Sequence, residues 1–275
     1  MEQLPGTPAP EPAGEARPGQ PLASGRTADV YALPGDRVLR RYRSGQSAAA
    51  EESLLLRLGA LGYPVPRVHP VPKPGGAALG SAEPGGAEPG GARLDSAGRA
   101  PLGPGDLVME RLHGPTLAEA LLGGAISPQQ AGAVLAHLLD RLHALPGRLV
   151  HLDLHPENVI NTAHGPVVID WSNAREDHPP GRDRAVSALI LAEVAVGPIP
   201  LARSVLAALL DGLTRPADAP DQPPFSEQEL AWAGDFRRAN PTLSPAEKRA
   251  LDLALELVAE QAARLPKGAR EQRSP

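Results

Sequence analysis

The sequence predicts an α+β fold in which strands form the first part of the chain and helices form the second. In the first part, residues 29–33 and 37–42 are rich in Val, Leu and Tyr and flank a Pro-Gly-Asp turn, which indicates a β-hairpin. In the second part, segment after segment opens with a helix-capping pattern and continues with apolar residues at helical spacing. Strands followed by helices indicate two lobes.

The strand-rich part contains one predicted helix and one further strand. A helix is expected from about 47 to 61, because Leu54, Leu55, Leu58 and Leu61 fall on one stripe. Prolines at 64 and 66 prevent its continuation. A strand at 107–110 is expected to join the sheet of the hairpin.

Four capping boxes begin helices in the second part. They pair Thr116 with Glu119, Ser127 with Gln130, Ser226 with Glu229, and Ser244 with Glu247. We expect helices at about 127–145, 183–197, 200–213, 226–239 and 244–264. Two short strands are expected between the first two of these helices, at 149–151 and 167–169.

Composition sets the predicted domain limits. Residues 1–20 and 266–275 are predicted to be tails. The first lobe is predicted to span 21–112 and the helical lobe 113–265. Within the first lobe, residues 71–105 repeat Ala-Glu-Pro-Gly-Gly and contain few large apolar side chains, so we expect a disordered insert.

Charge and hydropathy exclude several classes of partner. The net charge is −5, which gives no general attraction to nucleic acid. The chain has no run of about 18 apolar residues, so no membrane span is expected, and residues 1–22 do not have the pattern of a secretory signal. The chain has no cysteine, which excludes disulfides and thiolate metal sites and fits a cytoplasmic location. No oligomeric state is indicated.

The most informative segment begins at His151 and reads His-Leu-Asp-Leu-His-Pro-Glu-Asn. Asp153 is followed five residues later by Asn158, and Asp170 ends an apolar segment twelve residues further on. A kinase catalytic loop has this Asp-to-Asn spacing, with a later metal-binding Asp. Phosphoryl transfer needs a carboxylate beside the acceptor hydroxyl, which we assign to Asp153. It also needs oxygen ligands for Mg²⁺, which we assign to Asn158 and Asp170.

Residues 149–171 resemble the aminoglycoside phosphotransferase and choline kinase-like family. That family's loop typically reads His-Gly-Asp-x-His-x-x-Asn and is followed by Ile-Asp-Trp. Here Leu152 replaces the glycine. The resemblance implies a two-lobed protein-kinase-like fold, with a small β-rich N-lobe and a larger helical C-lobe. It also implies ATP or GTP as the donor and the hydroxyl of a small molecule, such as a cationic aminoglycoside or an amino alcohol, as the acceptor.

The resemblance also assigns nucleotide-binding roles. Arg40 stands where the family has a strand Lys, and no Lys precedes Lys73. Glu51 is expected to pair with it, with Glu52 as the alternative. The segment from Gly25 to Val30 would cover the phosphates. The purine hinge would comprise Met109, Glu110 and Leu112, and the residues supporting the catalytic loop would be His151, His155 and Asp183.

Other interpretations of these residues remain. Arg40 and Glu51 could be surface charges, and Trp171 could pack in the core. His151, Asp153 and His155 alternate, so a strand would turn all three to one face, as in a metal hydrolase completed by His164 or His178.

Two further alternatives concern the whole protein. A nucleotide-binding pseudokinase fits the missing strand Lys and the presence of Leu152. A protein kinase is disfavoured because no Ala-Pro-Glu-like segment follows Asp170. Acidic residues recur in the helical part and fit either a solvated surface or a site for a cationic acceptor. They are Glu176, Asp177, Asp211, Asp218, Asp221, Glu227, Glu229 and Asp235.

Overall fold

The computed structural model describes residues 21–265 except 26, 44, 71–101, 198, 200, 214–222 and 242. The predicted tails and nearly all of the predicted insert therefore lie outside the described residues. The chain divides into two compact units, one formed from 1–52 and 68–111 and the other from 53–67 and 112–275. The first unit contains the larger sheet and the second most of the helices, which confirms the α+β class.

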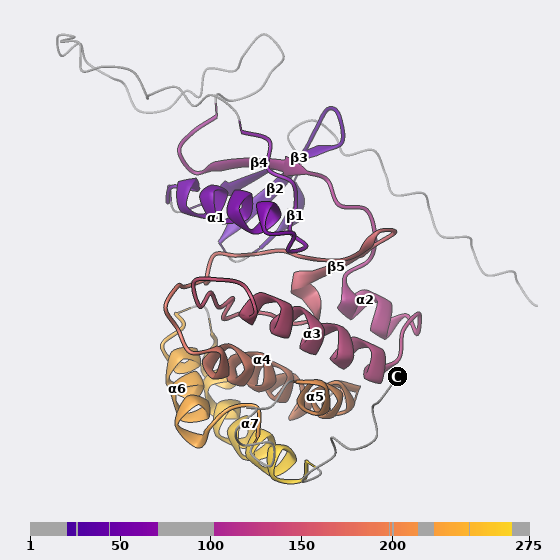
Figure 1. Cartoon of the computed structure of the whole chain (residues 1–275), viewed down its shortest axis with the longest axis vertical. Coiled ribbons are helices and arrows are strands. Elements are labelled where there is room, and N and C mark those ends of the chain that lie inside the picture. Colours follow the sequence, from indigo (N-terminus) through magenta and orange to yellow (C-terminus); the bar gives the residue numbers. More distant parts are fainter. Residues whose placement is uncertain are drawn as a thin grey trace, which may run out of the picture. The chain divides into compact units, whose positions relative to one another are not determined.

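The first unit contains a four-stranded antiparallel sheet, with its strands adjacent in chain order (Figure 1). The strands are β1 (Pro21–Ser24), β2 (Ala28–Leu33), β3 (Arg37–Tyr42) and β4 (Asp106–Glu110). The predicted hairpin is β2–β3, and β4 pairs with β3 as expected. Strand β1, which pairs with β2, was not predicted.

Helix α1 (Ala49–Ala60) is the helix predicted at about 47–61. Leu55 and Leu58 are buried, but Leu61 lies beyond the last helical residue and is 43% exposed, so the apolar stripe along the helix is shorter than predicted. Gly62 follows with a φ of +75°, a left-handed conformation that ends a helix at little steric cost in glycine.

In the second unit, α4 is the central helix (Figure 1). The helices are α2 (Leu117–Leu122), α3 (Pro128–His143), α4 (Pro180–Ala195), α5 (Leu201–Gly212), α6 (Glu227–Arg238) and α7 (Pro245–Ala263). Helix α4 packs against α5, α6 and α7, and α3 packs closely on α5. Residues 185–192 of α4 are all buried, so this helix forms the core of the unit.

All four predicted capping boxes are present, at the starts of α2, α3, α6 and α7. In each, the Ser or Thr side chain accepts from the backbone three residues on, and the Glu or Gln there accepts from the capping residue's N–H. Pro128 and Pro245 occupy the first helical positions, where a missing N–H costs nothing.

The predicted strand at 149–151 is wrong. Only Val150 makes a single β-bridge there, to Arg175. Leu149 and Val150 are nevertheless buried, at 3% and 0% exposure, so their apolar character reflects burial of a loop. The two-stranded sheet of this unit instead comprises β5 (Val159–Thr162) and β6 (Gly165–Val168), preceded by a 3₁₀ turn, η1 (Pro156–Asn158).

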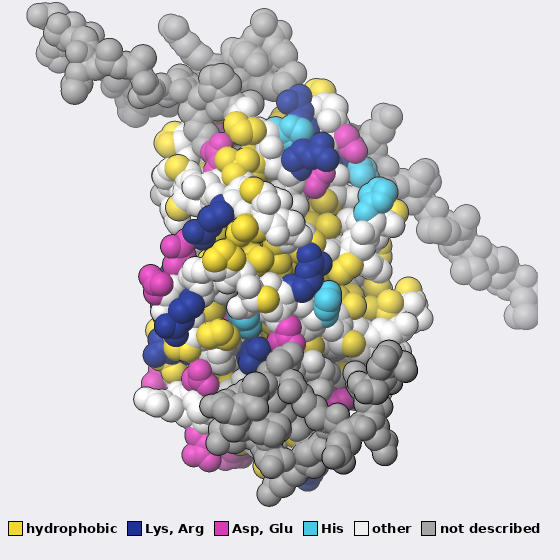
Figure 2. All heavy atoms as spheres, viewed as in Figure 1, with side chains coloured by type: hydrophobic (Ala, Val, Ile, Leu, Met, Phe, Trp, Pro, Cys, Tyr) yellow, Lys and Arg dark blue, Asp and Glu magenta, His cyan; other side chains and the backbone are white. Residues whose placement is uncertain are grey.

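Among the described residues, no helix combines the length and the apolar character needed to cross a bilayer. On the face shown in Figure 2, basic and acidic side chains are interspersed with apolar ones.

Candidate functional site

The loop that carries the predicted catalytic residues runs from residue 151 to residue 158, between Val150 and β5. Its beginning is fixed by the bridge at Val150, whose N–H and that of Arg175 each donate to the other residue's carbonyl oxygen at 3.0 Å. Its end is fixed by η1 and the β5–β6 hairpin. The loop is therefore attached to ordered backbone on both sides.

Asp183, near the start of α4, holds the interior of this loop. Its carboxylate accepts from the backbone N–H of His151 at 2.9 Å and of Leu152 at 2.7 Å, and it lies 2.9 Å from Nε2 of His143. Asp183 is fully buried, which opposes ionisation, but the hydrogen bond and charge of His143 outweigh burial and hold the pKa of Asp183 below its ordinary value. A buried carboxylate thus satisfies two loop donors at once.

Leu152, at the position of the family's glycine, has a φ of +59°. This left-handed conformation suits glycine and costs other residues roughly 1–2 kcal/mol. The Leu152 side chain is 1% exposed, so burial of its apolar surface offsets that strain. The loop therefore keeps a glycine-type backbone although it carries leucine.

His151 lies inside the fold beneath the loop. Its side chain is buried, its ring is 4.5 Å from that of Trp171, and its Nε2 is 3.2 Å from the carbonyl oxygen of Ile169. Trp171 is 2% exposed and packs edge-on against Tyr63. His151 thus connects the start of the loop to the segment around Asp170, and Trp171 is a core residue.

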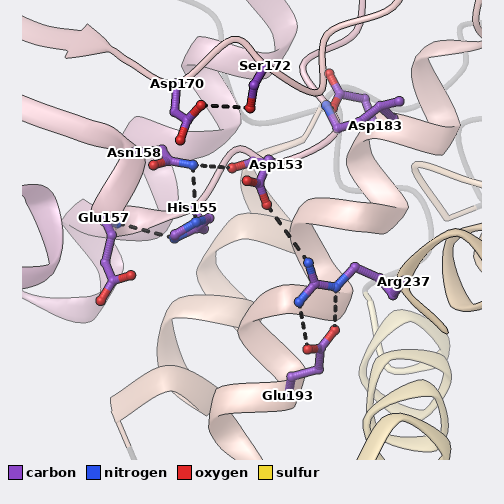
Figure 3. Close-up of polar contacts among 10 residues, drawn as sticks. Asp153, His155, Glu157, Asn158, Asp170, Ser172, Asp183, Glu193 and Arg237 are labelled. Carbon is purple, nitrogen blue, oxygen red and sulfur yellow. Dashed lines mark hydrogen bonds and ion pairs between the residues drawn. The ribbon is translucent and has the colours of Figure 1, made fainter. Parts of the chain in front are cut away.

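Asn158 and Asp170 lie at the open end of the β5–β6 hairpin. Val159 pairs with Val168, and the N–H of Ile169 donates to the carbonyl oxygen of Asn158 at 3.0 Å. The hairpin thereby brings together two residues that are twelve positions apart. Figure 3 shows their side chains beside each other, with Asp153 close by.

The amide of Asn158 is oriented by the loop itself. Its Nδ2 donates to the carbonyl oxygen of Asp153 at 2.9 Å and lies 3.1 Å from Nε2 of His155. The N–H of Glu157 donates to Nδ1 of the same ring at 3.4 Å, so the His155 side chain caps η1. With Nδ2 committed inward, Oδ1 is the amide atom that Asn158 can offer to a cation.

The side-chain oxygens of Asn158 and Asp170 are suitable ligands for Mg²⁺. The Oδ1 atom of Asp170 accepts from Oγ of Ser172 at 2.8 Å, which fixes one carboxylate oxygen and the orientation of the group. Mg²⁺ prefers oxygen ligands and is commonly held by one or two protein groups together with substrate phosphates and water. One amide oxygen and one carboxylate at neighbouring positions meet that requirement.

Asp153 has a charged neighbour that sequence reasoning missed. Nη1 of Arg237, on α6, is 3.9 Å from Oδ1 of Asp153. The same guanidinium makes two hydrogen bonds of 2.8 Å to Glu193 on α4 (Figure 3). The three residues are 40 or more positions apart, so no local pattern indicates that they meet.

The metal-hydrolase interpretation depended on a strand that is absent. Residues 151–155 form a loop in which His151 is buried and His155 faces Asn158. Within the described part of the chain, no group of three or more His, Asp or Glu side chains is arranged to hold a metal ion. His178 instead lies against the ring of Trp232, and His164 lies in the β5–β6 turn.

In the first unit, Arg40 and Glu51 form a buried ion pair. Nη1 of Arg40, on β3, is 3.0 Å from Oε1 of Glu51, on α1, and each residue is 7% exposed. Tyr42 also donates to Glu51, and the Arg40 guanidinium lies over the Tyr42 ring. Glu51 rather than Glu52 is therefore the partner, and neither Arg40 nor Glu51 is a surface charge.

The remaining predicted nucleotide-binding residues lie at the ends of strands. Gly25 follows β1, and its N–H donates to the carbonyl oxygen of Ala28 in the turn that leads into β2. Met109 and Glu110 are the last two residues of β4, where they pair with Val38 and Arg37. Leu112 is the first residue of the second unit after this strand.

Several of the acidic residues in the helical part have surface roles. Glu229 completes the capping box of α6. Glu176 pairs with Arg57, and Asp235 lies 3.3 Å from a guanidinium nitrogen of Arg238. Asp218 and Asp221 lie outside the described residues. For Glu176, Glu229 and Asp235, a role at the solvated surface is therefore the simpler explanation.

Comparison with known proteins supports the interpretation of the loop. Residues 89–183 match the model of the APH family, which is described as the phosphotransferase enzyme family. The matched segment includes the loop at 151–158, the β5–β6 hairpin and Asp183, and it confirms the predicted resemblance. No curated protein matches this sequence at a significant level.

Two solved structures are similar to this chain over most of its length. One is a choline/ethanolamine kinase family protein from Mesorhizobium loti, with 17% identity and a TM-score of 0.48, covering 91% of this chain and 93% of that protein. The other is the ADP-bound aminoglycoside phosphotransferase APH(2'')-Ib, with 13% identity and a TM-score of 0.45, covering 88% of this chain and 93% of that protein.

Proposed function

Because residues 89–183 match the phosphotransferase enzyme family, we propose that this protein transfers the γ-phosphate of ATP or GTP to a hydroxyl group of a small molecule. The observation that carries the proposal is the arrangement of the loop, in which Asp153, Asn158 and Asp170 lie around the end of one hairpin.

Asp153 is the group that acts on the acceptor. Its carboxylate accepts a hydrogen bond from the acceptor hydroxyl and orients that oxygen toward the γ-phosphorus. The acceptor oxygen forms a new bond to phosphorus while the bond from phosphorus to the β–γ bridging oxygen breaks. The hydroxyl proton passes to the Asp153 carboxylate, and the nucleoside diphosphate leaves.

Asn158 and Asp170 hold Mg²⁺ in this proposal, through the amide oxygen and the carboxylate. The ion neutralises charge on the phosphates when it is bound. Arg40, which takes the place of the family's strand Lys, contributes a permanent positive charge for the donor phosphates, and Glu51 orients it.

The rival interpretation, a pseudokinase, rests on two departures from the family pattern: Leu152 in place of the glycine and Arg40 in place of the strand Lys. The structure weakens both arguments, because Leu152 adopts the glycine-type backbone and Arg40 retains a buried acidic partner. We therefore favour turnover over nucleotide binding alone.

The proposal is tested by acceptor-dependent nucleotide consumption. Purified protein with MgATP or MgGTP is supplied with a panel of alcohols that includes sugars, polyols, amino alcohols and aminoglycosides. Nucleoside diphosphate and the phosphorylated alcohol are then measured together. The proposal expects equimolar formation of both for at least one acceptor class and none without divalent cation. Nucleotide binding without any phosphorylated product across the panel would support the pseudokinase.

A further inference from the structure

The side chains next to Asp153 include a guanidinium that the proposed reaction does not yet use. Arg237 approaches Asp153 with Nη1 at 3.9 Å and presents its other two nitrogens to Glu193 at 2.8 Å each. The first distance is longer than a hydrogen bond, so Arg237 offsets the charge of Asp153 without donating to this oxygen. Asp153 thus has a fixed positive charge as its neighbour.

The guanidinium is held rigidly. Two parallel hydrogen bonds to one carboxylate fix the plane of the Arg237 side chain, and the side chains of Arg237 and Glu193 are each 11% exposed. Burial disfavours the charged form of Arg237, but the hydrogen bonds and charge of Glu193 outweigh it and raise the pKa of Arg237. The positive charge is therefore permanent at physiological pH.

The position of Arg237 affects which acceptor can react. A hydroxyl that donates to Asp153 brings its neighbouring substituents within a few ångströms of Nη1, because a hydrogen bond to the carboxylate spans about 2.6–3.2 Å. A neighbouring hydroxyl or carboxylate oxygen can accept from the guanidinium. A neighbouring ammonium cannot accept a hydrogen bond from the guanidinium, and it meets a like charge in a partly desolvated position.

We propose that Arg237, oriented by Glu193, selects acceptors whose reacting hydroxyl is flanked by an oxygen substituent and disfavours those in which it is flanked by an ammonium. This inference rests on the proposed phosphotransferase function and narrows its acceptor class. It opposes the cationic acceptors that acidic composition alone suggested, because Arg237, on α6, places a positive charge 3.9 Å from the Asp153 carboxylate.

A purely structural role would have different consequences. The Arg237–Glu193 pair joins α6 to α4, and loss of such a pair lowers stability whether or not an acceptor is recognised. A structural tie predicts that removing either partner has the same sign of effect and leaves acceptor preference unchanged. A selectivity role predicts opposite changes in preference.

The experiment uses two matched pairs of acceptors with MgATP. One pair is glycerol and 2-amino-1,3-propanediol, and the other is glucose and 2-amino-2-deoxyglucose. Each pair differs by one hydroxyl against one ammonium. The measured quantity is the ratio of transfer efficiencies, kcat/KM, within each pair. The wild-type protein is expected to prefer the oxygen member by about tenfold or more.

Three variants test the cause of this preference. Arg237→Gln leaves the Glu193 carboxylate without its cation, so the ratio should shift toward the ammonium acceptor. Glu193→Gln keeps an acceptor for the guanidinium but removes the neutralising charge, so the ratio should shift further toward the oxygen acceptor. The double variant carries neither charge and should show a ratio near one, which also covers the case in which Arg237→Gln alone fails to fold.

Arg184→Gln is the matched control. Arg184, on α4, likewise forms a partly buried ion pair with a neighbouring helix. Its guanidinium is 3.0 Å from Asp140 on α3, and its side chain is 13% exposed. Its loss should reduce stability without changing the acceptor ratio.

Three results would overturn the inference. They are a wild-type preference for the ammonium members, the same ratio in both single variants, and no transfer to any of the four acceptors. The broader alcohol panel still decides separately whether the chain is a phosphotransferase.

Discussion

Replacing Asp183 with Asn should displace the loop at 151–158, because the buried Asp183 carboxylate accepts hydrogen bonds from two backbone N–H groups of this loop. The side chain of Asp183 accepts from the N–H groups of His151 and Leu152 and faces Nε2 of His143. An asparagine of the same shape has one carbonyl oxygen and one NH₂ group. Whichever way the amide turns, its NH₂ meets a group that was donating to the carboxylate.

The magnitude follows from this mismatch. A buried donor without an acceptor costs about 1–3 kcal/mol. The substitution leaves at least one backbone N–H without an acceptor, and it places the new NH₂ group, itself a donor, against that N–H. We expect Asp183→Asn to lower the free energy of unfolding by about 2–4 kcal/mol. A domain is stable by about 5–15 kcal/mol, so the protein should still fold, but with the loop displaced.

The assay compares urea unfolding with phosphoryl transfer. Transfer should fall by more than stability alone explains, because Asp153 directly follows the two residues whose hydrogen bonds are lost. Asp140→Asn is the control, since Asp140 pairs with Arg184 and its side chain is 24% exposed, and it should cost about 1 kcal/mol or less. Wild-type stability and transfer in Asp183→Asn would refute the loop-holding role.

The same residue predicts a dependence on pH. The pKa of Asp183 is lowered in the folded state, so its stabilising contribution is fully present above the unfolded pKa of about 3.9. That contribution is lost as the pH falls through the lower folded value. The wild-type protein should therefore lose stability in acid more steeply than Asp183→Asn, as measured by urea unfolding at a series of pH values.

Three further substitutions have defined outcomes. Leu152→Gly relieves roughly 1–2 kcal/mol of backbone strain but removes a buried side chain worth roughly 2–5 kcal/mol, so urea unfolding should show a net loss. A gain in stability there would contradict the assigned burial. Arg40→Lys should weaken nucleotide binding, measured by titration, because the buried ion pair with Glu51 is formed by a guanidinium. A large gain in transfer in this variant would indicate that the native site is compromised. Asp170→Asn should raise the Mg²⁺ concentration needed for half-maximal transfer, and an unchanged requirement would remove Asp170 from the cation site.

Local patterns explain what could be predicted from the sequence. The capping boxes at Ser226 and Ser244 need only four residues each, and both are present. The spacing from Asn158 to Asp170 was informative for a different reason. A short hairpin between them returns the chain to its starting point, although the hairpin strands themselves were not both predicted.

The failures come from long-range packing. The apolar residues Leu149 and Val150 have strand-like character, but they are buried without forming a strand, and Val150 only makes a bridge to Arg175. The N–H groups of the next two residues donate to Asp183, more than thirty positions away. Arg237 and Glu193 have no local signal, since each looks like an ordinary helical charge until α4 and α6 pack together. Burial of a charge depends on tertiary contacts that no short window contains.

The central claim is that Asp153 accepts the proton of an alcohol while the γ-phosphate is transferred to it. The most direct measurement compares wild-type protein with Asp153→Asn for two quantities, the rate of phosphorylated-alcohol formation from MgATP and the affinity for MgATP. Transfer should fall to background in the variant while nucleotide affinity stays within a few fold. Transfer at the wild-type rate by Asp153→Asn would contradict it.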